Sequence, residues 1–141
     1  MKGVRIFLAD GFEDVEALAV CDILRRGGVD VKLTAVGDAG SVRSSHGVSV
    51  IPDGHLADVG RSQEGTCRED VMIFPGGMPG SSTLASCTEL TDMMKAHYRA
   101  GGTVAAICAA PGLVLSQLDG LEGVEFTCFD GFETYLQAKG A

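Results

Sequence analysis

The chain has 141 residues, a formal net charge of −8 and 45% hydrophobic residues. This length predicts one domain with room for a substantial core. The acidic balance argues against specific nucleic-acid binding, which needs clustered Lys and Arg. The apolar runs are all strand-sized, so we expect no membrane span. The first of them is too short for a signal peptide, and we therefore expect a cytoplasmic protein.

Strands and helices alternate along the chain without a linker or an internal repeat. We expect strands over residues 4–9, 29–36, 71–74, 103–107 and 124–128, a hairpin over 41–51, and helices over 11–26, over 82–99 and directly after Cys108. The polar residues 61–69 indicate an exposed loop. This order predicts an α/β fold, a doubly wound and mostly parallel sheet in a flavodoxin-like three-layer sandwich with right-handed crossovers.

Glu16 is a carboxylate near the middle of an apolar side of the first helix. At ~100° per residue, the residues that share this side are Val15, Ala19, Val20, Ile23 and Leu24. One interpretation is that the first helical turn lies close enough to solvent and to the helix dipole to tolerate the charge. The interpretation we favour is a desolvated carboxyl that keeps its proton and shares it with a thiol.

A glycine-rich turn, residues 75–80, follows the expected strand at 71–74. Glycines at such a place let the backbone approach a ligand or a neighbouring loop closely. The turn lacks the Gly-Lys-Ser/Thr ending of a phosphate loop. Parallel sheets bind ligands at the carboxyl ends of their strands, so we expect this turn, residues 9–11 and Cys108 to meet at one edge.

Cys108 lies between a short apolar run, residues 103–107, and a segment of small residues with an early proline that suits a helix start. This pattern predicts a nucleophile elbow, where nearby backbone amides stabilise negative charge. The helix N-terminus would favour the thiolate. An inert buried cysteine is the alternative. The five cysteines share no metal-like spacing, so we expect neither a disulfide framework nor a metal site.

Three motifs carry a family resemblance: Gly-Phe-Glu-Asp-Val-Glu at 11–16, Phe-Pro-Gly-Gly-Met-Pro-Gly at 74–80 and Ala-Ala-Ile-Cys-Ala-Ala-Pro at 105–111. In this order they resemble the ThiJ/PfpI family of the class I glutamine amidotransferase-like superfamily, in the branch of the Parkinsonism-associated protein deglycase. The resemblance covers essentially the whole chain.

The resemblance implies that Cys108 is the reactive cysteine and that Glu16 is a protonated carboxyl hydrogen-bonded to it. It also implies that Gly77 and Ala109 supply oxyanion-hole amides, and it implies no metal and no cofactor. Many members carry a histidine near the position of Phe129. Because this chain does not, we expect Glu16 to carry more of the proton chemistry.

Family members usually continue some tens of residues beyond position 141. We therefore expect residues 1–141 to form a single domain that lacks the family's C-terminal strand and closing helices. The sequence leaves two alternatives open: part of a longer protein, or a natural chain whose site is open on one side.

The function that the resemblance implies is a cysteine-dependent enzyme acting on reactive carbonyls. It would convert methylglyoxal to lactate without glutathione, as a lyase, or hydrolyse glycated protein or nucleotide adducts, as a deglycase. A homodimer is implied as well. The alternative is an oxidative-stress sensor and redox-regulated chaperone with a peroxide-oxidisable Cys108. Peptide or amide hydrolysis is the least favoured reading, because no histidine is placed beside the cysteine.

Overall fold

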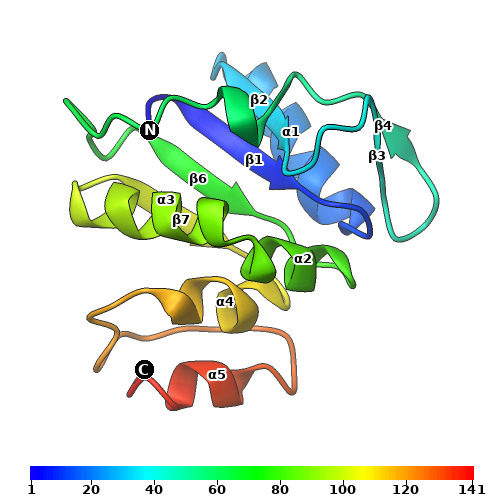
Figure 1. Ribbon diagram of the computed structural model, residues 1–141. Coiled ribbons are helices and arrows are strands. Elements are labelled where there is room, and N and C mark those ends of the chain that lie inside the picture. The colour runs from blue at the N-terminus through cyan, green and yellow to red at the C-terminus, as the bar shows by residue number, and fades with distance from the viewer.

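The computed structural model describes residues 1–141 and contains a central parallel sheet with helices on both faces (Figure 1). The five strands lie in the order β5-β2-β1-β6-β7, and every neighbouring pair is parallel. Their bounds are β1 Val4–Leu8, β2 Val31–Ala35, β5 Gly54–His55, β6 Val71–Phe74 and β7 Thr103–Ala106. The expected doubly wound, flavodoxin-like fold is confirmed.

The alternation of side chains along β1 creates two separate cores. Ile6 and Leu8 pack in a cluster beneath α1 (Asp14–Arg26), on one face of the sheet. Phe7 points to the other face and stacks on Phe74, with ring centroids 5.6 Å apart. That second face is covered by α2 (Gly80–Ser86), α3 (Thr88–Arg99) and α4 (Ala110–Leu113). The result is a three-layer sandwich.

The expected hairpin is confirmed, with β3 (Val42–Arg43) antiparallel to β4 (Ser49–Val50). It lies over the start of α1, where the Ser45 amide donates to the carbonyl of Phe12 at 2.8 Å. Val50 packs against the core beneath α1, whereas Ile51 is 81% exposed. Part of the apolar surface of the hairpin segment is therefore buried against the core, and part of it remains exposed.

The side of α1 that faces the core matches the one expected from the sequence only in part, since Val20 and Leu24 pack against the core as expected. Ala17 and Cys21 are buried, while Val15 and Ile23 are 68% and 67% exposed. This helix carries apolar residues around most of its circumference, so periodicity alone does not select the packed side. The small side chains of Ala17 and Cys21 let α1 pack closely on the sheet, and that contact sets its rotation.

Two other expected elements differ in the structure. The helix expected at 82–99 is two helices, because Cys87 adopts an extended conformation (ψ 95°) and separates α2 from α3. The Ser86 hydroxyl donates to the carbonyl of Ser82, a local bond that competes with helix continuation. Residues 124–128 contain no strand, because only the Phe129 amide reaches the chain after β7, at the carbonyl of Cys108.

Several short elements carried no clear sequence signal. These are β5, the 3₁₀ helices Leu56–Asp58 and Leu115–Gln117, and α5 (Glu133–Gln137). Each has five residues or fewer, which is too short for a period to be read. No helix is long and apolar enough to cross a membrane.

Candidate active site

Cys108 occupies a tight turn between the end of β7 and the start of α4. Its φ angle is 64°, which makes it the one residue other than glycine with a positive φ. A side chain in the left-handed region is strained, and such strain concentrates at functional sites. The thiol is half-buried, and the backbone amides of Ala109 and Gly77 act on it in the direction that lowers its pKa. The predicted nucleophile-elbow geometry is present in the structure.

Glu16 reaches the same point from the first turn of α1, which covers the face of the sheet opposite to α4. Its Oε2 accepts a 2.7 Å hydrogen bond from the Gly76 amide. The carboxyl oxygen and the Cys108 side chain lie on either side of Gly76, so the carboxyl is a neighbour of the thiol. It is half-buried, so the carboxyl belongs to the site rather than to the solvent-exposed side of the helix.

Gly76 and Gly77 allow these groups to approach one another. A Cβ on Gly76 would overlap Oε2 of Glu16 and would lie 2.6 Å from Cβ of Cys108. Gly77 has a φ of 91°, and a Cβ there would lie 2.5 Å from the carbonyl oxygen of Gly11. The Glu13 amide donates to the Gly76 carbonyl at 2.9 Å. The turn after β6 is thus packed against the loop that starts α1, as the sequence predicted.

The electrostatics of the thiol differ from the expectation of a ready thiolate. Burial, followed by the negative charge of Glu16, raises the pKa of Cys108. The amides of Ala109 and Gly77 act in the opposite direction but do not outweigh these two effects. The predicted lowering of this pKa is therefore wrong in direction. The reason is the carboxylate beside the sulfur, which disfavours a second negative charge at the same place.

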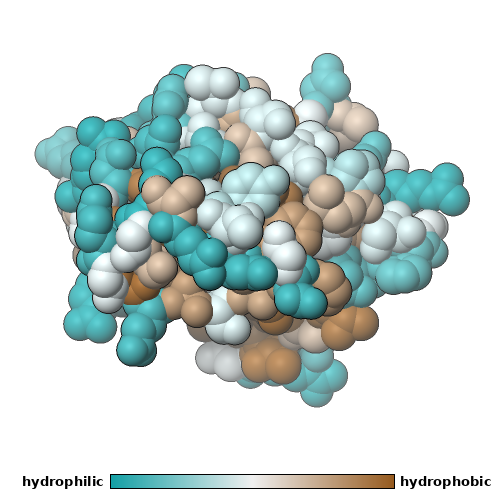
Figure 2. Space-filling model, turned by 90° about the horizontal axis from the view of Figure 1, so that it is seen from below, coloured by the Kyte–Doolittle hydropathy of each residue, from teal (hydrophilic) through white to brown (hydrophobic).

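A cavity of about 290 Å³ opens beside the sulfur. Its lining residues are Glu16, Ala106, Ile107, Cys108, Thr127, Cys128 and Phe129. Phe129, one of these lining residues, is 58% exposed. The whole face of the molecule that is seen from below carries hydrophobic patches between hydrophilic residues (Figure 2). An aldehyde-sized molecule fits this volume.

The sequence predicted Cys108, Glu16, Gly77 and Ala109 at this site, and the structure adds Cys128. Cys128 lies one residue before Phe129, whose amide donates to the Cys108 carbonyl at 2.7 Å. The signal available in the sequence was its place at the end of the expected strand 124–128, as Cys108 follows the expected strand 103–107.

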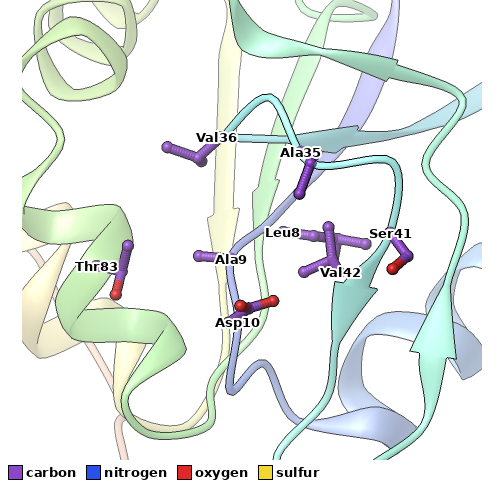
Figure 3. A pocket seen from close by; sticks show the side chains of 10 residues that line it. Leu8, Ala9, Asp10, Ala35, Val36, Ser41, Val42 and Thr83 are labelled. Atoms are coloured by element: carbon purple, nitrogen blue, oxygen red, sulfur yellow. The ribbon is translucent and has the colours of Figure 1, made fainter.

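A larger cavity, of about 400 Å³, lies at the carboxyl ends of β1 and β2 (Figure 3). Small apolar side chains form most of its wall, with Asp10 at its base and Thr83 of α2 across from it. One oxygen of Asp10 accepts the Arg43 amide at 2.9 Å. The cavity contains no cysteine, so it is not where a thiol reaction would take place.

The one grouping with metal-ligand character is Glu13, Asp14 and His46, whose ligand atoms lie within 4.8 Å of one another. Hydrogen bonds within the protein account for it: Asp14 accepts from the Ser44 hydroxyl at 2.5 Å and lies 2.9 Å from Nδ1 of His46. The Ser44 bond, with a further contribution from His46, lowers the pKa of Asp14 to about 2. The group fastens the hairpin to α1.

The other two histidines are hydrogen-bonded as well. His97 is fully buried, with Nε2 3.0 Å from the carbonyl oxygen of Asp70. His55 contacts the carbonyl of Ala39 at 3.1 Å. Neither lines the cavity beside Cys108.

Comparison with known proteins decides the family. Residues 2–141 match the DJ-1/PfpI family. The chain belongs to this family. Over 137 residues it is 38% identical to Protein DJ-1 homolog B of Arabidopsis thaliana, covering 97% of this chain and 30% of the relative. It is also 34% identical over 116 residues to a Caenorhabditis elegans protein named glutathione-independent glyoxalase DJR-1.2, covering 82% of this chain and 58% of the relative.

Solved structures agree with this assignment. The oxidised form of Toxoplasma gondii DJ-1 superposes with a TM-score of 0.72 at 37% identity, covering 82% of this chain and 60% of that one. The chain thus spans less than two thirds of the length of each of these three proteins.

Proposed function

We propose that this DJ-1/PfpI member is a cysteine-dependent enzyme that acts on small reactive carbonyls without glutathione. The observation that carries the proposal is the convergence of the Glu16 carboxyl and the Gly77 and Ala109 amides on the Cys108 sulfur. A nucleophile, a proton carrier and two fixed donors are what addition to an aldehyde needs. The glyoxalase name of the Caenorhabditis elegans relative supports this substrate class.

In the first step, the Cys108 thiol adds to the aldehyde carbon of methylglyoxal. Glu16 accepts the thiol proton as the carbon–sulfur bond forms, because the pair holds one proton and one negative charge between them. The aldehyde oxygen becomes an oxyanion, which the Gly77 and Ala109 amides stabilise. The oxyanion takes that proton from Glu16 to give a hemithioacetal, which leaves Glu16 as a carboxylate for the second step.

In the second step, Glu16 moves a proton from the former aldehyde carbon to the neighbouring carbonyl carbon through an enediol. The product is a lactoyl thioester on Cys108, and no external oxidant or reductant is consumed. Water then hydrolyses the thioester, which releases lactate and restores the thiol. In the deglycase variant the same sulfur would attack an early carbonyl adduct on an amine or thiol.

Incubating the protein with methylglyoxal, without glutathione and in the presence of a chelator, tests the proposal. We expect lactate to form, and Cys108→Ser to abolish its formation. Cys67→Ser is the matched control, since Cys67 lies in the exposed loop before β6, outside the cavity. Lactate formation that survives Cys108→Ser but is lost in Cys128→Ser would overturn the assignment.

A second candidate function is an oxidative-stress sensor with redox-regulated chaperone activity. Its support is the same sulfur, half-open to solvent beside a carboxyl that can hydrogen-bond an oxidised product. Peroxide treatment followed by an aggregation assay with an unfolded client protein would distinguish it from the enzyme. In the sensor case oxidation of Cys108 increases client protection, whereas in the enzyme case it only removes turnover.

A further inference from the structure

Two thiols, not one, line the cavity beside the elbow. Cys108 and Cys128 are both half-buried and both contribute to its wall, together with Glu16. The other three cysteines lie elsewhere: Cys21 in the core beneath α1, Cys67 in an exposed loop and Cys87 between α2 and α3. A shared cavity therefore selects one pair from the five.

One backbone hydrogen bond brings the segment of Cys128 to that of Cys108. Residues 124–129 follow β7 through the connection that contains α4. The Phe129 amide donates to the Cys108 carbonyl at 2.7 Å. The residue directly before this donor is Cys128.

The Cα atoms of Cys108 and Cys128 each lie within one peptide group of this hydrogen bond. Disulfides form readily between residues whose Cα atoms are roughly 4.4–6.8 Å apart. Backbone placement therefore allows a bond between the two sulfurs without a change of fold.

We propose that Cys128 is a resolving cysteine that traps oxidised Cys108 as an intramolecular disulfide. The inference rests on the reactivity of Cys108 assumed in the proposed function and adds a second, reversible outcome for that sulfur. It assigns Cys128 a role in protecting the nucleophile from irreversible oxidation.

The chemistry uses a peroxide as the oxidant. The Cys108 thiol attacks the peroxide, the O–O bond breaks, and the products are a sulfenic acid and water or an alcohol. The Cys128 sulfur then attacks the sulfenic sulfur, the S–O bond breaks, and hydroxide leaves with the Cys128 proton as water. Glu16, in the wall of the same cavity, is placed to carry that proton.

Without Cys128, the sulfenic acid has no thiol partner in the cavity, and a second peroxide molecule oxidises it to the sulfinic acid, which thiols do not reduce. Burial, and then the negative charges of Glu133 and Asp130, raise the pKa of Cys128. We therefore expect the disulfide step to be faster at pH 9 than at pH 7.

The test treats the full chain and the Cys128→Ser variant with an excess of hydrogen peroxide over the two equivalents that a sulfinic acid requires, and maps their peptides without reduction. We expect a crosslink between the peptides of Cys108 and Cys128, a mass lower by two hydrogen atoms, and no dependence on protein concentration. Dithiothreitol should restore the free thiols and the aldehyde turnover. In Cys128→Ser, Cys108 should instead gain the mass of two oxygen atoms, and dithiothreitol should restore nothing.

Cys87→Ser is the matched control, because Cys87 is also half-buried but lies outside the cavity, and it should form the crosslink as the unaltered chain does. If the unaltered chain reaches the sulfinic acid as fast as Cys128→Ser, the resolving role is wrong while the reactivity of Cys108 stands. If Cys108 neither oxidises nor supports turnover, the proposed function is wrong and this inference with it.

Discussion

The amide of Gly76 donates a 2.7 Å hydrogen bond to Oε2 of Glu16, and the α-carbon of the same residue faces Cβ of Cys108. A methyl group at position 76 would overlap the carboxyl oxygen and lie 3.1 Å from the Cys108 sulfur. Because Gly76 has no side chain, the Glu16 carboxyl and the Cys108 thiol can lie next to each other.

The first prediction is that Gly76→Ala displaces Glu16 and lowers kcat/KM for methylglyoxal by about 100-fold, the usual effect of a shift of ~1 Å at a reacting group. Steady-state kinetics measure it. Gly60→Ala is the matched control, since a Cβ there meets nothing within 4 Å, and its kinetics should be unchanged. Full activity in Gly76→Ala would mean that Glu16 is not needed at the sulfur.

The second prediction concerns the charge of Glu16. Burial, and then this negative charge, raise the pKa of Cys108, so Glu16→Gln should lower that pKa. The thiolate of the unaltered protein should therefore appear only as the pH rises above the usual thiol range, and that of Glu16→Gln at lower pH. Thiolate absorbance against pH measures both curves.

A Cys108 pKa that does not fall in Glu16→Gln would indicate that Glu16, and not the thiol, holds the proton. If Glu16 held the proton and donated it to a thiolate, as the sequence suggested, Glu16→Ala would remove the donor and raise the pKa of Cys108. Glu16→Gln, which keeps a donor, would change it little. The two variants together decide which group carries the shared proton.

These residues illustrate what could be derived from sequence. Four of the five parallel strands and the elbow could be derived, because strand–turn–helix patterns are local; β5 was missed. The rotation of α1 about its axis could not be derived from the sequence. Val15 is exposed and Ala17 is buried because of how the helix packs against the sheet, not because of their hydropathy. The direction of the Cys108 pKa shift needed the place of Glu16 in three dimensions.

The pairing of Cys128 with Cys108 could not be predicted from the sequence either. Its neighbours in the chain predicted a strand, and the structure has an extended segment held to Cys108 by a single hydrogen bond. Twenty residues separate the two cysteines, so only the crossover brings them together. Sequence spacing without the topology does not reveal a pair of this kind.

The third prediction concerns strain at Cys108, whose φ is 64°. A left-handed residue with a Cβ costs about 1–2 kcal/mol, and glycine avoids this cost. We expect Cys108→Gly to be more stable than Cys108→Ala by about 1 kcal/mol in urea unfolding. At neighbouring Ile107, whose φ is not positive, the order should reverse, with glycine less stable than alanine. Equal stabilities of the two Cys108 variants would show that the turn is relaxed.

The last prediction is the homodimer that the family resemblance implies. Val15, Ala19 and Ile23 lie at helical spacing on the exposed side of α1, and Ile51 of the adjoining hairpin segment is 81% exposed. Apolar surface of this kind needs cover, and a second copy of the chain would supply it. We expect sedimentation at micromolar concentration to give twice the chain mass, and Val15→Asp with Ile23→Asp to give a monomer. Tyr98→Asp on α3, across the sheet, is the control and should remain dimeric. A monomeric mass for the unaltered protein, or a dimer that persists in the double variant, would rule out this surface as the interface.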